Sequence, residues 1–245
     1  MANRFDRLMN RAIWTLGGPK RALQTDTALV SFTFDDVPDS ARSPGADILE
    51  HYGARGTFYI AGGLAGTVEA DRSIITPPDC RDLAERGHEL GCHTFSHRKV
   101  RSFSGAEFAR DLDRNADYLA GLGLAAPPRN FAFPYNSAWP PARSEFRSRF
   151  RSCRGAGESV NRGMVDPLML KSVAIGPEAE ARALTRWIDD VVADPGWLIF
   201  FGHDVAANPT PYGCTPQTFD HLVRYAAERG CAILPVDRAL DRIGW

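Results

Sequence analysis

The stretch from Leu29 to Asp39, Leu-Val-Ser-Phe-Thr-Phe-Asp-Asp-Val-Pro-Asp, places the strongest constraint on the fold. Its first six residues are mostly β-branched, aromatic or aliphatic, a composition that suits a buried strand. The run then stops at two adjacent carboxylates, Asp35 and Asp36. Two negative charges at one edge of a sheet repel each other unless a metal ion or another cation compensates one of them. The stretch therefore predicts a strand that ends either in a solvated acidic turn or in a cation site.

Short apolar strands alternate with amphipathic helices along most of the chain. Further strands are predicted at 57–61, 88–92, 130–133, 152–156, 168–175, 197–202 and 231–236. Helices are predicted near 41–52, 79–87, 104–120, 142–150, 178–192 and 215–229. This alternation is typical of parallel strands joined by right-handed crossovers. Because 245 residues suit a single barrel or layered domain, we expect one α/β domain.

The N-terminal residues have a different pattern. Apolar residues recur at helical spacing between 5 and 16, and Arg4, Arg7 and Arg11 lie between them. This pattern predicts an amphipathic helix with a basic face, which either packs on the barrel floor or rests on anionic lipid. We therefore divide the chain into an N-terminal amphipathic segment, 1–24, and a barrel domain, 25–245.

Composition excludes several classes of protein. A net charge of −1 argues against a general nucleic-acid binder. No apolar run approaches the length of a membrane span, and residues 1–24 contain no apolar core of a secretory signal. The five cysteines are widely spaced and never form a Cys-x-x-Cys pair, which fits reduced thiols better than a disulfide framework. We expect a cytoplasmic protein.

Polar residues follow several of the predicted strands directly. They are Asp35-Asp36, His93 to His97, Pro134-Tyr135-Asn136 and His203-Asp204. The carboxyl ends of parallel barrel strands converge on one face, where such folds build their sites. These residues are therefore predicted to meet in space although they are far apart in the sequence.

His93 and His97 are separated by four positions, so on a helical turn they would share one side and bind one ion. Such a pair is common in protein cores, but a strand-end aspartate adds a third ligand. Two histidines and one carboxylate leave coordination positions open for water and substrate, as a catalytic zinc requires. The second aspartate is then available as a base, and His203 as a proton donor to the leaving group. The pattern predicts metal-assisted hydrolysis.

Four motifs in order resemble the polysaccharide deacetylases, also called NodB-homology proteins or carbohydrate esterase family 4. The motifs are Thr33-Phe34-Asp35-Asp36, His93-Thr-x-x-His97, Phe131-Ala-Phe-Pro-Tyr135 and Phe201-Gly-His203-Asp204. The resemblance extends over roughly residues 28–240. It implies a distorted (β/α) barrel of seven or eight strands and metal-dependent hydrolysis of an N-acetyl group.

The resemblance also implies a role for each matched residue. The metal-binding residues are Asp36, His93 and His97. The catalytic residues are Asp35 as the base, His203 as the acid, and Tyr135, whose backbone N–H stabilises the oxyanion. The implied cofactor is one divalent ion, zinc, with cobalt or iron in some members.

This chain departs from the family pattern at two positions. Val37 stands where the family has glycine, and valine takes a positive φ only at a cost, so the loop is expected to differ in detail. Ala132 stands where the family often has an arginine that pairs with the base. We expect Arg154 to orient Asp35 instead, with Arg162 behind it.

The aspartate that usually supports the acid histidine has no obvious equivalent in this chain. We assign that supporting role to Asp166. Two aromatic residues near the predicted loops, Trp139 and Tyr212, are interpreted as packing residues that also have the shape to stack on sugars.

These observations predict a metal-dependent hydrolase that removes N-acetyl groups from N-acetylglucosamine-type sugars. The substrate would be a polysaccharide, such as an exopolysaccharide or adhesin, or its lipid-linked precursor, with peripheral contact at the inner membrane face through the N-terminal helix. One alternative is an amidase or deformylase of the same fold that acts on a small cyclic amide or N-formyl substrate. A second is an inactive glycan-binding protein, against which the intact set of acidic and histidine residues argues.

Overall fold

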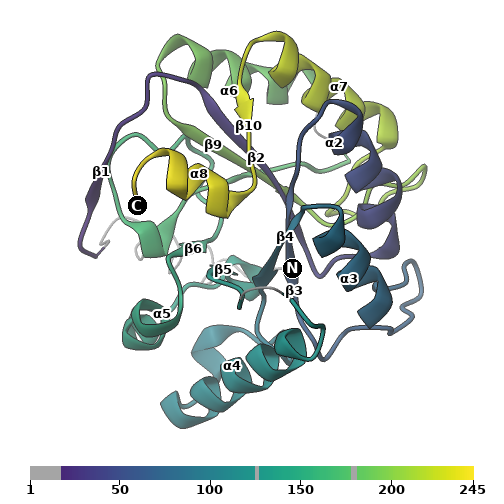
Figure 1. Cartoon of the computed structure of the whole chain (residues 1–245), viewed down its shortest axis with the longest axis vertical. Coiled ribbons are helices and arrows are strands. Elements are labelled where there is room, and N and C mark those ends of the chain that lie inside the picture. The colour runs from purple at the N-terminus through teal and green to yellow at the C-terminus, as the bar shows by residue number, and fades with distance from the viewer. Residues whose placement is uncertain (1–17, 125–126, 178–180) are drawn as a thin grey trace.

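A curled parallel sheet covered by helices forms the body of the computed structural model, which describes residues 18–124, 127–177 and 181–245 (Figure 1). Neighbouring strands follow the order β6-β5-β4-β3-β2-β9-β8, and β10 pairs with one end of β2. The strands are β2 (Leu29–Asp35), β3 (Thr57–Ile60), β4 (Glu89–Cys92), β5 (Asn130–Ala132), β6 (Ser152–Arg154), β8 (Val173–Ala174), β9 (Trp197–Gly202) and β10 (Ala232–Ile233). All of these pairings are parallel, which confirms the predicted α/β barrel type.

Strand β2 is the centre of the sheet, because its two sides pair with β3 and β9. Its pairing with β9 runs from Leu29 opposite Trp197 to Phe34 opposite Gly202, and all seven of its residues are buried. Phe32 stacks on Phe200 at 5.4 Å between ring centroids, within a core that lies under the helices. Polar residues alternate with apolar ones along this buried strand, and the hydroxyls of Ser31 and Thr33 donate hydrogen bonds to the carbonyl oxygens of Leu234 and Phe200.

The two edges of the sheet approach each other through one segment. Leu170 forms an isolated parallel bridge with Arg154 of β6, and the chain then continues into β8, which pairs with β9. The segment 170–174 therefore links the β6 edge to the β9 side and curls the sheet into a barrel-like shape.

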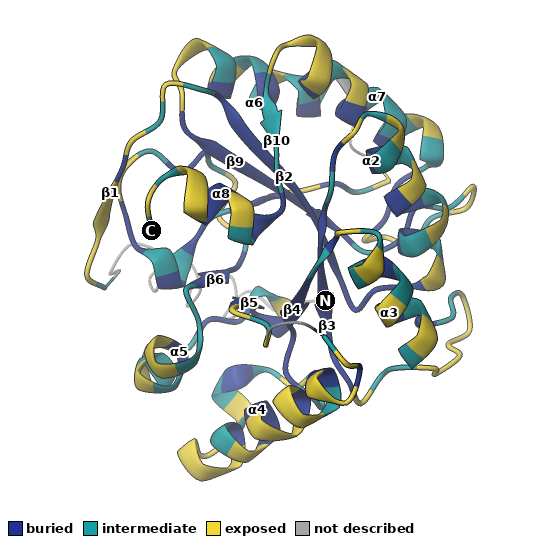
Figure 2. Ribbon diagram, in the orientation of Figure 1, coloured by how far each residue is buried: buried dark blue, intermediate teal, exposed yellow. Residues whose placement is uncertain are grey.

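Helices surround the sheet with their apolar faces turned inward, as the buried stripes in Figure 2 show. They are α2 (Asp47–His51), α3 (Pro77–Glu85), α4 (Gly105–Ala120), α5 (Arg143–Arg149), α6 (Ala181–Ala193), α7 (Pro216–Glu228) and α8 (Val236–Arg242). Single helical turns of π or 3-10 type are η1 (Ala41–Ala46), η2 (Val100–Ser102), η3 (Pro134–Asn136), η4 (Pro140–Ala142) and η5 (Pro167–Met169). In the part of the chain that the structure describes, no helix combines the length and the apolar character needed to cross a membrane.

A small antiparallel pair lies beside the main sheet. Strand β1 (Arg21–Leu23) pairs with β7 (Gly163–Val165), and both were absent from the predicted elements. Residues 21–23, counted above with the N-terminal segment, thus pack against the barrel, with Leu23 buried. The amphipathic helix predicted within residues 4–16 lies outside the described residues.

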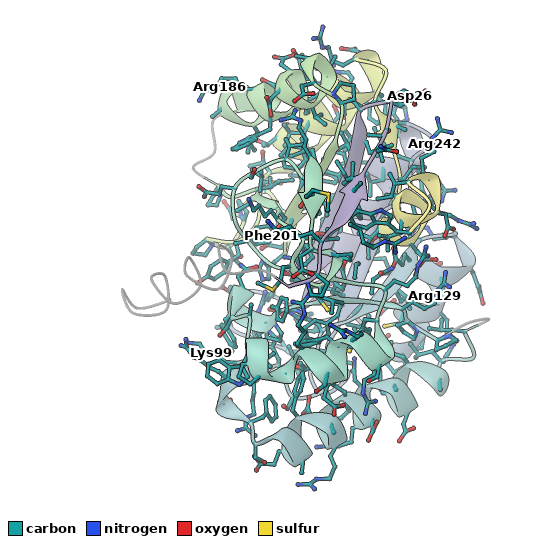
Figure 3. The ribbon with its side chains drawn as sticks, turned by 90° about the vertical axis from the view of Figure 1, so that its left-hand side faces the viewer. Asp26, Lys99, Arg129, Arg186, Phe201 and Arg242 are labelled. Carbon is teal, nitrogen blue, oxygen red and sulfur yellow. The ribbon has the colours of Figure 1, made fainter. Side chains whose placement is uncertain are left out.

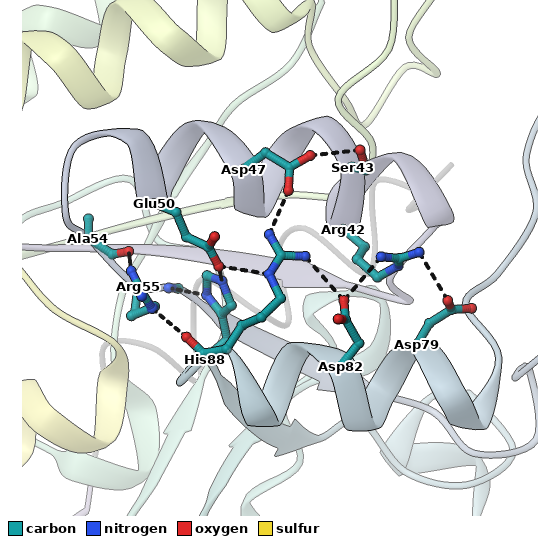
Figure 4. A network of polar contacts seen from close by, with 11 residues as sticks. Arg42, Ser43, Asp47, Glu50, Ala54, Arg55, Asp79, Asp82 and His88 are labelled. Carbon is teal, nitrogen blue, oxygen red and sulfur yellow. Dashed lines mark hydrogen bonds and ion pairs between the residues drawn. The ribbon is translucent and has the colours of Figure 1, made fainter.

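An ion-pair network fastens α3 to the segment of η1 and α2 (Figure 4). Arg42 bridges Asp79 and Asp82 of α3 at 3.2 and 3.0 Å, and Arg86 just after α3 reaches Asp47 of α2 at 2.5 Å. Each partly exposed pair contributes little, about 0–1 kcal/mol. Together they set how the two helices lie beside the loop that follows β2.

Candidate metal and catalytic site

The C-terminal ends of the strands open into a cleft of about 690 Å³. Loops that follow β2, β3, β4, β5, β8 and β9 all contribute to its lining. In Figure 3, Lys99, which lines the cleft, lies at the left of the molecule and Phe201, also in the lining, lies near its middle, whereas Arg129 and Arg242 lie at the right. The cleft is therefore where the topology predicts a site in a parallel barrel.

Asp36, His93 and His97 meet in this cleft as a group able to hold a metal ion. Their ligand atoms all lie within 4.8 Å of one another. Asp36 Oδ1 is 2.9 Å from His97 Nε2 and 3.5 Å from His93 Nε2. This oxygen is buried and has no hydrogen-bond partner, a state that is costly unless a cation satisfies it. The residues present therefore fit a divalent metal ion.

The surroundings of His93 favour a neutral ring that binds metal through Nε2. Its Nδ1 lies 2.9 Å from the carbonyl oxygen of Ala132, so Nδ1–H donates to that oxygen and Nε2 carries the lone pair. Burial lowers the pKa of His93 to about 4. Burial alone would raise the pKa of Asp36, but the adjacent His97 and the nearby His93 and His203 lower it overall.

The prediction that His93 and His97 share a helical turn is wrong. Residues 93–97 form an irregular loop in which Thr94 and His97 have φ values of 62° and 49°. The buried Asp111 of α4 holds this loop, accepting the Phe95 N–H at 2.8 Å and the Ser96 N–H at 3.2 Å. The two rings still converge because the loop, rather than a helix, turns them toward Asp36.

Asp35 forms a buried ion pair and hydrogen bond with Arg154, the residue expected to replace the missing arginine. Arg154 stands directly opposite Ala132 in the β5–β6 pairing, so the guanidinium reaches the site from the neighbouring strand. Its side chain is fully buried, with Cζ 5.2 Å from the ring centroid of Tyr59 and 4.9 Å from that of Phe201. Burial would raise the pKa of Asp35, but the Arg154 charge and hydrogen bond, together with the nearby His93 and His203, outweigh it, so the net shift is downward.

The loop after β2 contains the costly conformation that the sequence raised for Val37. Asp36 and Val37 have φ values of 59° and 58°, although a β-branched residue rarely adopts this conformation. The Val37 side chain is fully buried, and its carbonyl oxygen accepts a hydrogen bond from Ile75 N–H at 3.1 Å. Packing and this bond hold the strained turn that directs Asp36 into the cleft.

His203 lies beside the metal group, with Nε2 3.7 Å from Asp36 Oδ2. Its Nδ1 faces the carbonyl oxygen of Tyr212 at 3.3 Å. The prediction that Asp166 supports His203 is contradicted, because Asp166 caps η5 through the Leu168 N–H and pairs with Arg143 at 2.6 Å. A backbone carbonyl, not a carboxylate, stands behind the histidine.

Tyr135 lines the cleft in a left-handed conformation, with φ 57° and ψ 20°. Its ring lies 4.7 Å from that of His97, between centroids, and 54% of the residue is exposed. The next residue, Asn136, places Oδ1 3.4 Å from Arg154 Nη1. Arg162 lies elsewhere, paired with Asp190 and Asp194.

Two site residues escaped the sequence predictions. Arg72 contacts Asp36 Oδ2 at 3.3 Å from a loop with no distinctive pattern. Asp111 lies on the inner face of α4 with Phe108, Leu112 and Asn115. The helical spacing of Asp111 and Asn115 beside an apolar stripe was a readable signal for polar residues that clamp a loop.

Comparison with known proteins shows the family. The polysaccharide deacetylase family model matches residues 22–148, more than half of the chain, and this range contains Asp35, Asp36, His93, His97 and Tyr135. The chain belongs to the polysaccharide deacetylase family. The family resemblance inferred from the four motifs is thereby confirmed, as is membership of a deacetylase family of hydrolases.

Curated members of the family are similar over part of their length. A chitin deacetylase from Arthroderma benhamiae is 28% identical over 111 residues, which make up 45% of this chain and 29% of that protein. A chitooligosaccharide deacetylase from Azorhizobium caulinodans is 28% identical over 128 residues, 51% of this chain and 55% of that protein. The matched region thus spans 29% to 55% of the length of these relatives.

Solved structures of the same family share the fold of this chain. A family 4 acetyl xylan esterase from Clostridium thermocellum, in complex with a cobalt ion, superimposes with a TM-score of 0.60 at 20% identity. The match covers 87% of this chain and 90% of that one. The fold therefore extends beyond residue 148, over the strands that carry Arg154 and His203.

Proposed function

We propose that this deacetylase uses one divalent metal ion to remove N-acetyl groups from N-acetylglucosamine-type sugars. The observation that supports it best is the orphaned Oδ1 of Asp36 between two imidazole nitrogens, next to a second carboxylate with its own arginine. Asp36, His93 and His97 would hold the ion, with zinc the first choice and cobalt or iron as substitutes. When bound, the ion supplies Lewis acidity to the substrate carbonyl and to water.

The protein residues around that centre have complementary tasks. Asp35, kept ionised by Arg154, accepts a proton from the attacking water. The backbone N–H of Tyr135 donates a hydrogen bond to the oxyanion that forms as the carbonyl becomes tetrahedral. His203, oriented by the Tyr212 carbonyl, then donates a proton to the departing amine. Acetate and a free amino sugar are the products.

Features of the cleft support a glycan as the substrate rather than a small amide enclosed in a narrow pocket. Tyr135 and Tyr212 both line it, and each is 54% exposed, so their ring faces are accessible to sugars. Aromatic rings beside a polar centre are suited to stacking on the apolar faces of sugar rings. The relatives named above are a chitin and a chitooligosaccharide deacetylase, which supports an N-acetylglucosamine polymer or its lipid-linked precursor as the substrate.

The place of action is part of the same proposal. The basic amphipathic pattern of residues 4–16 supports contact with anionic lipid at the inner membrane face, where precursors of an exopolysaccharide or adhesin would be met. Sedimentation with phosphatidylglycerol vesicles tests it. We expect binding by the full chain and its loss in Arg7→Glu/Arg11→Glu; equal binding by both would contradict the membrane contact.

The enzymatic proposal is tested by acetate release from N-acetylglucosamine oligomers. The protein is assayed as purified, after chelation, and after zinc or cobalt is added back. Release should stop with the chelator, return with the metal and be absent in Asp35→Asn. The matched control is Asp26→Asn, on the opposite side of the molecule (Figure 3), which should keep full activity. Undiminished release after complete metal removal, or by Asp35→Asn, would contradict the proposal.

A further inference from the structure

A short hairpin in the loop between β3 and α3 carries the cationic residue nearest to Asp36 Oδ2. Val68 and Ser73 form an antiparallel bridge, Ile74 N–H donates to the Thr67 carbonyl at 2.9 Å, and Glu69 N–H donates to the Arg72 carbonyl at 2.8 Å. We call residues 67–74 the 67–74 hairpin. Its tip is closed by hydrogen bonds rather than by an apolar core, so its position depends on what it docks against.

The 67–74 hairpin docks on the strained turn that carries Asp36. Asp39 N–H donates to the Ser73 carbonyl at 2.8 Å, and Pro38 and Ile74 form an antiparallel bridge. Ile75, directly after the hairpin, donates its N–H to the Val37 carbonyl. The backbone on either side of Val37 is therefore tied to the same segment that presents Arg72.

The two oxygens of the Asp36 carboxylate face different partners, and Arg72 contacts only Oδ2. Its Nη2 lies 3.3 Å from Oδ2 of Asp36, and its Nε lies 2.7 Å from Oε2 of Glu69. The Arg72 side chain is only 15% exposed, so solvent does not replace this contact freely. Oδ1 meanwhile faces His93 and His97 and has no hydrogen-bond partner.

We infer that Arg72 is a positioning residue, which reserves Oδ1 of Asp36 for the metal and prevents Oδ2 from binding the same ion. The inference rests on the proposed metal centre and goes beyond it. A carboxylate free to bind through both oxygens would occupy one more coordination position, which water and substrate need. Partners of ligating carboxylates commonly fix their orientation in this way. Asp35 thus has an arginine from strand β6 and Asp36 has one from the 67–74 hairpin, and one oxygen of Asp36 remains for the ion.

A measurement of metal affinity alone does not separate the effect of Arg72 on the orientation of the Asp36 carboxylate from the effect of its positive charge. Removing the Arg72 cation strengthens the attraction between the site and a divalent ion, because two positive charges a few ångströms apart repel each other. Losing the orientation of the carboxylate weakens binding, by about 10–100-fold for comparable outer partners. The decisive property is therefore the coordination of the ion, which the visible absorption of Co²⁺ reports.

The experiment compares cobalt-loaded wild type, Arg72→Met and Arg72→Lys, with Arg42→Met as the matched control. Arg42 is also a partly buried arginine that bridges two carboxylates, but it lies in the α2–α3 network (Figure 4). We expect Arg72→Met to show severalfold weaker visible bands, because the second carboxylate oxygen raises the coordination number. Arg72→Lys, which keeps a donor for Oδ2, and Arg42→Met should retain the wild-type spectrum.

Each outcome decides the inference. A wild-type spectrum in Arg72→Met, whether cobalt binds as before or more tightly, overturns the positioning role but leaves the proposed metal centre intact. Absence of a cobalt spectrum in the wild type overturns the metal centre as well. If Arg72→Met fails to fold, judged by circular dichroism, Arg72→Gln takes its place and is expected to show the same weakened bands.

Discussion

Carboxylates lie at both ends of the parallel strands, and their surroundings are opposite in kind. At the C-terminal ends, Asp36 presents a buried oxygen without a hydrogen-bond partner to two histidines. At the N-terminal ends, Glu89 of β4 accepts hydrogen bonds from Asn130 at 2.6 Å, and from Thr57 and the Asp237 N–H at 2.8 Å each. The first arrangement is incomplete without a cation. The arrangement around Glu89 is complete and caps α8. We call this side of the sheet, at the N-terminal ends of the strands, the barrel floor.

Backbone strain separates the two ends in the same way. Among the described residues, positive φ values outside glycine occur at Asp36, Val37, Thr94, His97, Tyr135, Asn136 and Glu158. All but Glu158 belong to the loops after β2, β4 and β5 that line or adjoin the cleft. Strain of this kind persists where surrounding packing over-determines it, and it is concentrated at functional sites. Among the described residues, backbone strain outside glycine is therefore concentrated at the cleft.

The largest expected effect is at Asp36. Asp36→Asn removes one anionic ligand, so we expect the affinity for Zn²⁺ to fall by more than about 100-fold, beyond the usual loss for an outer partner. Glu89→Gln, on the floor, should leave the affinity unchanged. Titration against a chromophoric chelator measures both. Equal affinities in the two variants would remove the distinction between the ends.

The next effect is on stability and concerns the ion pair inside the barrel. Arg154→Met leaves the buried Asp35 charge uncompensated, which should lower the free energy of unfolding by about 3–5 kcal/mol. Asp35→Leu/Arg154→Met removes both charges and should recover much of that loss. Urea denaturation of metal-free protein compares the two. A double variant no more stable than the single one would show that Arg154 acts by packing, not charge.

A smaller loss is expected on the floor. Glu89→Gln replaces one acceptor oxygen with an NH₂ group that faces existing donors, so we expect a loss of about 1–3 kcal/mol in unfolding free energy. Thermal and urea denaturation at neutral pH measure it. A neutral effect would mean that the hydrogen bonds to Glu89 add nothing to the cap of α8.

The pH dependence of the stability of Glu89→Gln is a further test of the difference between the two ends of the strands. Desolvation raises the pKa of Glu89, so the folded chain holds this proton more tightly than the unfolded chain. The contribution of Glu89 to stability is therefore fully present below the ordinary glutamate pKa, near 4.3, and is lost as pH rises through the raised value. As pH rises from the ordinary glutamate pKa through the raised value, wild type should lose stability relative to Glu89→Gln. The change in the difference between their free energies of unfolding should stay below a few kcal/mol. A constant difference would contradict the raised pKa.

Prediction from sequence succeeded where one segment carries its own signal. The predicted strand 197–202 is β9 to the residue, because an uninterrupted apolar run between glycines leaves little choice. The capping pattern of Ser104 and Glu107 marks the start of α4 for the same reason. Short elements were missed or overextended: α8 was absent from the predicted elements, and only Val173–Ala174 of the predicted strand 168–175 is β8.

The site residues follow the same rule: those with a signal in their own segment were predicted, and those held by tertiary contacts were not. Arg154 was predicted to orient Asp35 because Ala132 stands in the usual arginine position, and the structure brings Arg154 and Asp35 together. Asp166 was assigned wrongly, although an aspartate directly before a proline is a typical start of a helical turn. Arg72 had no local signal, since its approach to Asp36 depends on a hairpin held by tertiary hydrogen bonds.

The most direct test of the proposed metal centre is a crystal structure of the zinc-loaded protein with anomalous data at the zinc edge. We expect one ion, bound by Oδ1 of Asp36 and by Nε2 of His93 and His97, with Asp35 still on Arg154. We expect no ion at Glu89 and Asp237 on the floor. An ion at the floor, or none in the cleft at saturating zinc, would contradict it.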